Sequence, residues 1–129
     1  MQHIIDWPFC GRYTTFAKSY FMKLWSQVLG EGPDLIIMHG LFGMSDNWQS
    51  LAKKWAPDFR VHLLDMRNHG RSPQSDEFSY ELMAEDLLEY LEDNKLSKVN
   101  ILGHSMGGKV AMLFSVFHPD KVAALIVAD

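Results

Sequence analysis

The sequence predicts an α/β fold in which helices flank a mostly parallel sheet. Short, largely apolar runs recur within residues 35–40, 59–66, 98–105 and 122–129, as expected for strands covered on both faces. Helical patterns follow the first three runs, so strands and helices alternate along the chain. Because this alternation requires crossover connections, it favours parallel pairing with helices on the faces of the sheet.

The N-terminal third of the chain contains two contrasting segments. In residues 1–21 the aromatic side chains follow neither a strand period nor a helix period, and we expect an atypical, loosely packed extension there. Residues 23–30 can form a strand, and EGPD at 31–34 has the composition of a turn. A helix is expected within residues 45–58, ending before Pro57, with an apolar face made by Trp48, Leu51, Ala52 and Trp55.

Two further strand-to-helix units and a last strand complete the pattern. The helix expected within residues 79–94 has Ser79 in position to cap it and an apolar stripe of Tyr80, Met83, Leu87 and Leu91. The third unit joins a strand at 98–105 to a helix within 106–120, and a strand at 122–129 closes the chain.

Composition narrows the class of protein further. A chain of 129 residues that is 47% hydrophobic fits one globular domain. The net charge of −4, without a run of like charges, argues against a nucleic acid partner. Cys10 is the only cysteine, which excludes an internal disulfide and a multi-cysteine metal site and fits the cytoplasm. No apolar run approaches the roughly 18 residues of a membrane span, and we expect neither membrane contact nor a cofactor.

Ser105 is the candidate nucleophile. Residues 103–107, GHSMG, match the G-x-S-x-G pattern, and the serine stands between an apolar strand and a predicted helix. A sharp strand-to-helix turn would strain the Ser105 backbone and expose its Oγ, and Gly103 and Gly107 would let neighbouring backbones come close. The alternative is a glycine-rich turn that binds phosphate at the helix N-terminus, although the lysine and hydroxyl pair of a P-loop is absent.

An attacking serine also needs hydrogen-bond donors for the oxyanion that develops. The backbone N–H of Met106, at the helix start, is one candidate, and that of Leu41, in the HGLFG loop after the first buried strand, is the other. In the same loop His39 and Gly40 would shape the turn, with the His39 side chain expected to be a buried structural imidazole. Phe42 is expected near the acyl pocket. His104 would border the same space beside the nucleophile.

Four motifs occur together in the order HGLFG, DNW, DMRNHGRSP and GHSMGGKVAM. In this order they resemble the α/β-hydrolase superfamily, specifically its small acyl-ester and thioester hydrolases. The resemblance covers residues 22–129 and implies the N-terminal half of such a domain, without its cap and last strands. It also makes Met22 the equivalent of the usual family start, so residues 1–21 look like an addition.

The resemblance suggests partners for Ser105. In one subgroup of the superfamily the triad acid follows the strand after the elbow helix, the position of Asp129 here. Asp129 is equally an ordinary aspartate at a strand end, and both interpretations stay open. The catalytic histidine of the superfamily comes from a loop further downstream. The chain would therefore be catalytically incomplete, because a triad serine without its histidine retains only the rate from binding and the oxyanion hole.

The histidines of this chain offer few substitutes for that base. His69 lies in the polar loop of Asp65, Arg67, Asn68, Arg71 and Ser72, which resembles a structural turn whose charges pair with one another. His69 as a base is an alternative, but a role in this polar network is the main expectation. His62, His104 and His118 are expected to be structural or exposed, and His3 falls in the unassigned extension.

Two hypotheses about function follow. The first is a serine hydrolase of small acyl esters or thioesters that acts through an acyl-enzyme on Ser105. The second is a non-catalytic α/β module, either truncated or an interaction partner, that keeps the elbow without turnover. In both cases the last strand would leave an apolar edge uncovered, which favours self-association through that strand.

Overall fold

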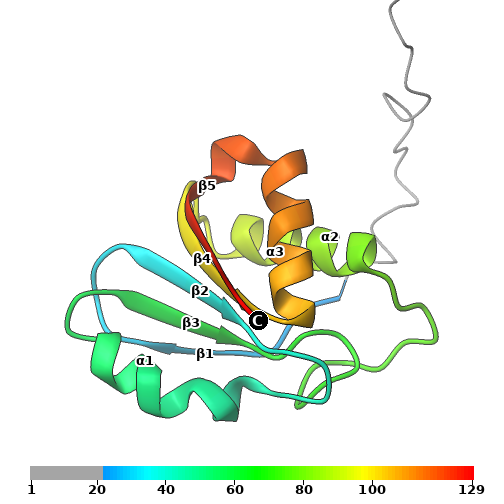
Figure 1. The fold of residues 1–129 in the computed structure, drawn as a ribbon, viewed down its shortest axis with the longest axis horizontal. Coiled ribbons are helices and arrows are strands. Elements are labelled where there is room, and N and C mark those ends of the chain that lie inside the picture. The colour runs from blue at the N-terminus through cyan, green and yellow to red at the C-terminus, as the bar shows by residue number, and fades with distance from the viewer. Residues whose placement is uncertain (1–21) are drawn as a thin grey trace, which may run out of the picture.

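A five-stranded sheet forms the centre of the molecule, in a computed structural model that describes residues 22–129 (Figure 1). The strands are β1 (Ser26–Leu29), β2 (Asp34–Met38), β3 (Arg60–Leu64), β4 (Val99–His104) and β5 (Val122–Ala128), and their order in the sheet is β1-β3-β2-β4-β5. The α/β architecture predicted from the sequence is therefore confirmed. The expected extension at 1–21 and Cys10 lie outside the described residues.

The sheet is parallel except at one edge. β2 pairs in parallel with β3 and β4, and β4 pairs in parallel with β5. β1 is antiparallel to β3, with Ser26 opposite Leu64. β1 reaches β2 through a tight turn that contains Gly30 and Gly32, both with positive φ. Carbonyl oxygens of Ala56, Asp58 and Phe59 occupy the space that side chains at these two positions would need.

Helices cover both faces of the sheet. A 3₁₀ turn, η2 (Ser45–Trp48), leads into α1 (Gln49–Trp55) on one face, while α2 (Tyr80–Asp93) and α3 (Met106–Phe117) lie together on the other (Figure 1). A second 3₁₀ turn, η3 (Pro119–Lys121), joins α3 to β5. The three strand-to-helix units predicted from the sequence are all present.

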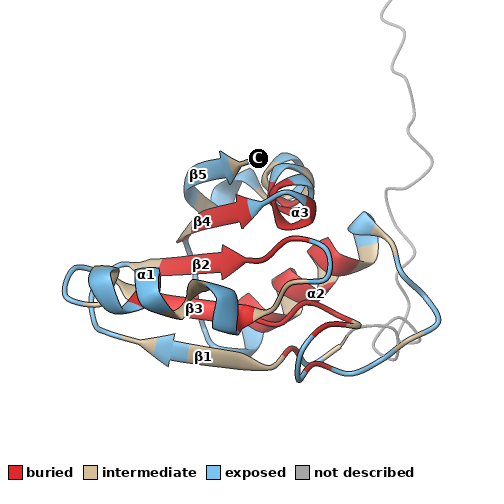
Figure 2. Cartoon of the chain, turned by 60° about the horizontal axis from the view of Figure 1, so that its bottom comes forward, coloured by how far each residue is buried: buried red, intermediate tan, exposed pale blue. Residues whose placement is uncertain are grey.

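Coverage on both faces explains why the central strands are apolar without alternation. In β2, Ile36 and Met38 join the larger core under α2 and α3, whereas Leu35 and Ile37 join the smaller core under α1. β2 and β3 are the most deeply buried strands, as Figure 2 shows. Successive side chains on a strand point to opposite faces, so an apolar run is required wherever both faces are covered.

The helix patterns are confirmed in part. The Ser79 hydroxyl accepts a hydrogen bond from the N–H of Leu82 at 3.2 Å, which is the predicted cap of α2. Met83, Leu87 and Leu91 are fully buried, but Tyr80 is 39% exposed, because it lies in the first turn of α2 with the Lys109 ammonium over its ring. On the predicted face of α1, only Ala52 is fully buried.

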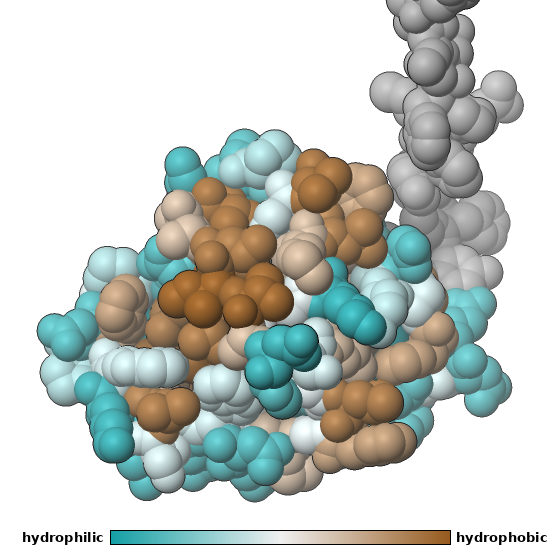
Figure 3. All heavy atoms as spheres, viewed as in Figure 1, coloured by the Kyte–Doolittle hydropathy of each residue, from teal (hydrophilic) through white to brown (hydrophobic). Residues whose placement is uncertain are grey.

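β5 forms an exposed edge of the sheet. Its residues 123–127 are all exposed, including Leu125, Ile126 and Val127, and so are Val116 and Phe117 on the neighbouring α3. Figure 3 shows apolar side chains gathered over the part of the molecule where β5 and α3 lie in Figure 1. Within residues 22–129, no helix has the length and apolar character needed to cross a membrane.

Candidate active site

Ser105 occupies a strained turn between β4 and α3. Its backbone has φ 49° and ψ −110°, outside the regions that a serine normally adopts, and the residue is exposed. The turn is held at both sides, because the Ser105 N–H donates to Ala128 O at 2.9 Å and the Ser105 carbonyl accepts from Lys109 N–H at 3.1 Å. Strain of this kind costs on the order of 1–3 kcal/mol and collects at functional sites. The turn thus has the geometry expected of a nucleophile elbow.

The glycines around Ser105 allow this turn to form. A Cβ on Gly103 would collide with the carbonyl of Gly107, and a Cβ on Gly107 would collide with the carbonyl of Met38 in β2. At Gly108 a Cβ would meet the Val127 side chain at 2.8 Å. The first turn of α3 therefore sits directly against β4, β2 and β5, which is the close approach predicted from the sequence.

The loop after β2 meets the elbow at the same edge of the sheet. Met38 pairs with Gly103, so His39 and His104 leave adjacent parallel strands side by side. A Cβ added to Gly40 would lie 2.8 Å from His104 Nδ1 and 3.4 Å from Ser105 Cβ. Glycine at position 40 lets the HGLFG loop pack against the elbow, as expected at the carboxyl edge of an α/β sheet.

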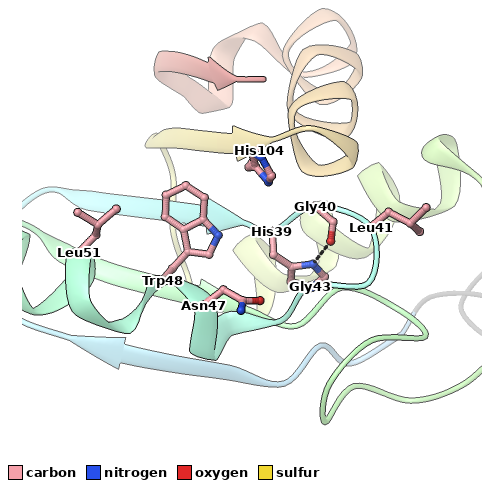
Figure 4. Close-up of a pocket in the computed structure, with 8 residues that line it drawn as sticks. All are labelled: His39, Gly40, Leu41, Gly43, Asn47, Trp48, Leu51 and His104. Atoms are coloured by element: carbon pink, nitrogen blue, oxygen red, sulfur yellow. Dashed lines mark hydrogen bonds between the residues drawn. The ribbon is translucent and has the colours of Figure 1, made fainter.

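A pocket of about 350 Å³ opens beside this contact (Figure 4). In the close-up His104 lies above the pocket at the end of β4, and Leu51 and Leu41 lie at opposite ends. The rings of Trp48 and His104 have centroids 6.1 Å apart. The lining residues are His39, Gly40, Leu41, Gly43, Asn47, Trp48, Leu51 and His104.

Three of the four predicted pocket residues, His39, Gly40 and His104, line this cavity, whereas Phe42 does not. Phe42 has a positive φ of 61° and a side chain that is 92% exposed. The sequence pattern also placed Trp48 and Leu51 on a core-facing helix surface. Both line the pocket, and Trp48 also packs against the smaller core as predicted. The DNW motif was the signal for Asn47 and Trp48, although the resemblance gave those residues no role.

The other predicted site residues lie at the same edge of the sheet. Met106 is the first residue of α3, where the N–H groups of a helix have no intrahelical acceptor. Leu41 lies in the loop that contacts the elbow and is 52% exposed. Asp129 follows Ala128, which pairs with His104 and accepts the Ser105 N–H, and its side chain is exposed. The roles predicted for these residues remain predictions.

The histidines of the described chain are mostly engaged elsewhere. His39 and His69 each use both ring nitrogens in hydrogen bonds to backbone groups, and His62 uses both with Tyr90 and Asp34. The structural role expected for the His39 side chain is therefore confirmed, and so is a place for His69 in the local hydrogen-bond network. The Ser105 side chain makes no capping hydrogen bond at the start of α3.

Charges in the loop after β3 pair only partly within that loop. Burial alone would raise the pKa of Asp65, but hydrogen bonds from the N–H groups of Arg71 and Ser45 hold this pKa below its usual value. Arg71 pairs with Asp65 of the same loop at 3.8 Å and also with Asp46 of η2, whereas Arg67 pairs with Asp86 of α2. The expectation that these charges pair among themselves is thus wrong for Arg67, because its side chain points into the buried interface with α2.

Nothing in the described residues assembles a metal centre. Among residues 22–129, no three side chains of histidine, cysteine, aspartate or glutamate gather closely enough to hold a metal ion. The polar groups at this sheet edge are a hydroxyl, imidazoles, backbone amides and the carboxylate of Asp129.

The fold and this edge define an α/β protein with a strained, exposed serine at the carboxyl end of its sheet. The chain belongs to the α/β-hydrolase fold family, whose model matches residues 33–129. It is 46% identical over 99 residues to a mouse protein named sn-1-specific diacylglycerol lipase and 38% identical over 95 residues to an Escherichia coli protein named esterase YbfF. These alignments cover 75% and 74% of the chain, respectively.

A solved structure described as a marine microorganism esterase also resembles this chain in fold and sequence. It superimposes with a TM-score of 0.83 at 56% identity over 84% of this chain. In all three comparisons the chain spans well under half of the relative: 32% of the mouse protein, 37% of the E. coli protein and 42% of the marine esterase. The family of this chain is therefore established. The activity of its longer relatives can only be proposed for it.

Proposed function

We propose that this chain carries the nucleophile half of a serine hydrolase acting on small acyl esters or thioesters. The observation that carries the proposal is the strained, exposed Ser105 at the strand-to-helix turn. Relatives named esterase and lipase support ester chemistry. The mostly apolar surroundings of the pocket, with Leu41, Trp48 and Leu51, suit a short acyl group.

The proposed reaction proceeds through an acyl-enzyme. Ser105 Oγ attacks the acyl carbon, its proton passes to a general base, and the alcohol or thiol departs with a proton from the same group. Water then hydrolyses the Ser105 ester and releases the acid. We propose that the N–H groups of Leu41 and Met106 stabilise the oxyanion in both steps, because their two turns meet at the elbow.

The base itself is proposed to come from outside residues 22–129. Both nitrogens of His39, His62 and His69 are engaged in hydrogen bonds, so accepting the Ser105 proton would break bonds that hold the fold. His118 follows α3 at the end remote from Ser105. His104 lines the pocket next to the nucleophile, and its role is proposed to be contact with substrate.

A fluorophosphonate probe tests the proposal, because it reacts covalently with activated serines. With added imidazole in place of the base proposed to lie outside residues 22–129, labelling of the chain should be lost in Ser105→Ala and retained in Ser97→Ala, a matched change at an exposed serine between α2 and β4. Equal labelling of both variants, with the fold intact by circular dichroism, would favour the alternative of a non-catalytic α/β module.

A further inference from the structure

Two buried histidines face each other beneath the HGLFG loop. His39 follows β2 and His69 lies in the loop after the neighbouring β3; their exposed fractions are 1% and 8%. The ring centroids are 5.0 Å apart, with the ring planes inclined at 53°. The site chemistry proposed above uses neither ring, so their burial side by side requires another explanation.

The partners of each ring determine where its proton lies. His39 Nε2 faces the N–H of Met66 at 3.0 Å, and its Nδ1 faces the carbonyl of Gly40 at 2.7 Å. A backbone N–H can only donate and a carbonyl can only accept. Nε2 must therefore be an unprotonated acceptor and Nδ1 must carry the hydrogen, so this imidazole is neutral.

The hydrogen-bond partners of His69 fix its tautomer in the same way. His69 Nε2 faces the N–H of Phe42 at 3.2 Å, and its Nδ1 faces the carbonyl of Arg67 at 2.8 Å. His69 is thus also neutral, with its hydrogen on Nδ1. The arrangement is reciprocal: each loop supplies an imidazole that accepts a hydrogen bond from a backbone amide of the other loop, and each ring donates to a carbonyl of its own loop.

The turn held in this way is strained and lacks side-chain support at its tip. Phe42 adopts φ 61°, which is unfavourable for an aromatic residue, while its side chain is 92% exposed. Burial of the Phe42 ring therefore does not hold this conformation. The carbonyl of Gly40 accepts from the N–H of Gly43 at 2.9 Å as well as from His39, which closes the turn around Leu41.

We propose that His39 and His69 are positioning residues, which form a reciprocal neutral clamp that fixes the turn at 40–43 against the elbow. A side chain at Gly40 would collide with His104 and touch Ser105, so the turn packs closely against the elbow and the clamp determines where the Leu41 N–H sits relative to Ser105. The clamp itself follows from the hydrogen bonds alone, whereas its effect on the oxyanion hole rests on the proposed function.

The first test requires no substitution. In the ¹⁵N-labelled chain at pH 7.5, two-bond ¹H–¹⁵N correlations report the tautomer of each histidine ring. Both His39 and His69 should show a neutral ring protonated at Nδ1. A charged ring, or a hydrogen on Nε2 of either residue, would overturn the clamp.

The second test removes one acceptor and restores it. In His69→Leu the Phe42 amide should exchange its hydrogen about fivefold faster or more, since one buried hydrogen bond is lost. His69→Gln should restore most of the protection, because its side-chain oxygen reaches as far as Nε2. His118→Leu, at the far end of α3, serves as the matched control and should leave Phe42 unchanged. If the hydrogen-exchange rate of the Phe42 amide is the same in a folded His69→Leu chain as in the unsubstituted chain, the clamp is also overturned.

Fluorophosphonate labelling of the same samples, again with added imidazole in place of the missing base, separates the two proposals. Labelling of Ser105 that falls in His69→Leu and recovers in His69→Gln supports the positioning role. Labelling that stays constant across these variants contradicts that role. If the unsubstituted chain shows both Nδ1–H rings and a protected Phe42 amide but no labelling, the clamp is supported and the proposed hydrolase function is what fails.

Discussion

Arg67 and Asp86 form a doubly hydrogen-bonded ion pair in which both side chains are completely buried. Arg67 Nε lies 2.7 Å from Asp86 Oδ2, and Nη2 lies 2.8 Å from Oδ1. Arg67 Nη1 also donates to the carbonyl of Glu77, and Asp86 accepts from the N–H of Met22. The pair thereby joins the loop after β3, helix α2 and the start of the described chain.

Removing one member of this pair should be costly. Arg67→Met leaves the Asp86 carboxylate buried without its cation, and the free energy of unfolding should fall by about 3–5 kcal/mol in urea denaturation. Arg71→Met is the control for loss of a surface arginine: the Arg71 side chain is 47% exposed, pairs with Asp46 and at 3.8 Å with Asp65, and lies over the Trp25 ring, and its removal should cost clearly less than that of the buried Arg67. A loss for Arg67→Met no larger than that of the control would contradict this account of the pair.

Gly107→Ala should disrupt the elbow. A methyl group at this position would collide with the Met38 and His39 carbonyls, so α3 would have to move away from β2. We expect a loss of about 3 kcal/mol of stability together with loss of Ser105 labelling. Val116→Ala, on the exposed side of the same helix, should change stability by no more than about 0.5 kcal/mol. Wild-type stability in Gly107→Ala would show that the close approach is not required.

His39 should make the fold sensitive to acid. Burial lowers the pKa of His39, and the neighbouring His69 ring adds to this, while its hydrogen bond to Gly40 and the charge of Asp65 act in the opposite direction. When the chain unfolds, the imidazole regains an ordinary pKa of about 6.5. Below that pH the unfolded state binds more protons, so the stabilisation present above pH 6.5 is lost as the pH falls towards the folded pKa.

Urea denaturation between pH 8 and pH 5 measures this effect. The decrease in stability across that range should be smaller in His39→Gln, which keeps an acceptor near the Nε2 position but cannot titrate. An unchanged slope in a folded His39→Gln chain would show that another group is responsible.

The exposed face of β5 and α3 should drive association. Leu125, Ile126, Val127, Val116 and Phe117 are all exposed, and β5 is an edge strand with one side of its backbone unpaired. We propose that two copies pair through this strand. Light scattering should show a concentration-dependent dimer that Ile126→Lys disrupts, whereas Val28→Lys on the opposite edge strand should leave it intact. A monomer at all concentrations would refute the proposal.

Turnover of an activated aryl ester should be slow and dependent on Ser105. Without an imidazole on its hydroxyl, a serine nucleophile loses several orders of magnitude in rate. Added imidazole should partly replace the base and raise the rate of the wild-type chain above that of Ser105→Ala under the same conditions. If hydrolysis is already fast without added imidazole, the proposal that the base comes from outside residues 22–129 is wrong, and His104→Ala becomes the informative variant.

Local sequence patterns were enough to predict the strand-to-helix units, the cap at Ser79 and the turn at Ser105. Each depends on residues within a few positions of one another: apolar runs for strands, 3.6-residue spacing for helices, and glycines where backbones approach. The motifs HGLFG and GHSMGGKVAM also indicated which two turns meet at the sheet edge, because the carboxyl ends of neighbouring parallel strands lie together.

Only the tertiary structure decided which distant groups pair. Arg67 and Asp86 are 19 residues apart in the sequence. His69 is 27 residues from Phe42, whose amide donates a hydrogen bond to its ring. The antiparallel direction of β1, the exposure of Phe42 and the positions of Trp48 and Leu51 in the pocket likewise depend on how the loops close over the sheet. A buried polar group bonds to the donor or acceptor that the packing of the whole chain brings within about 3 Å. The periodicity of the nearby sequence does not specify that partner.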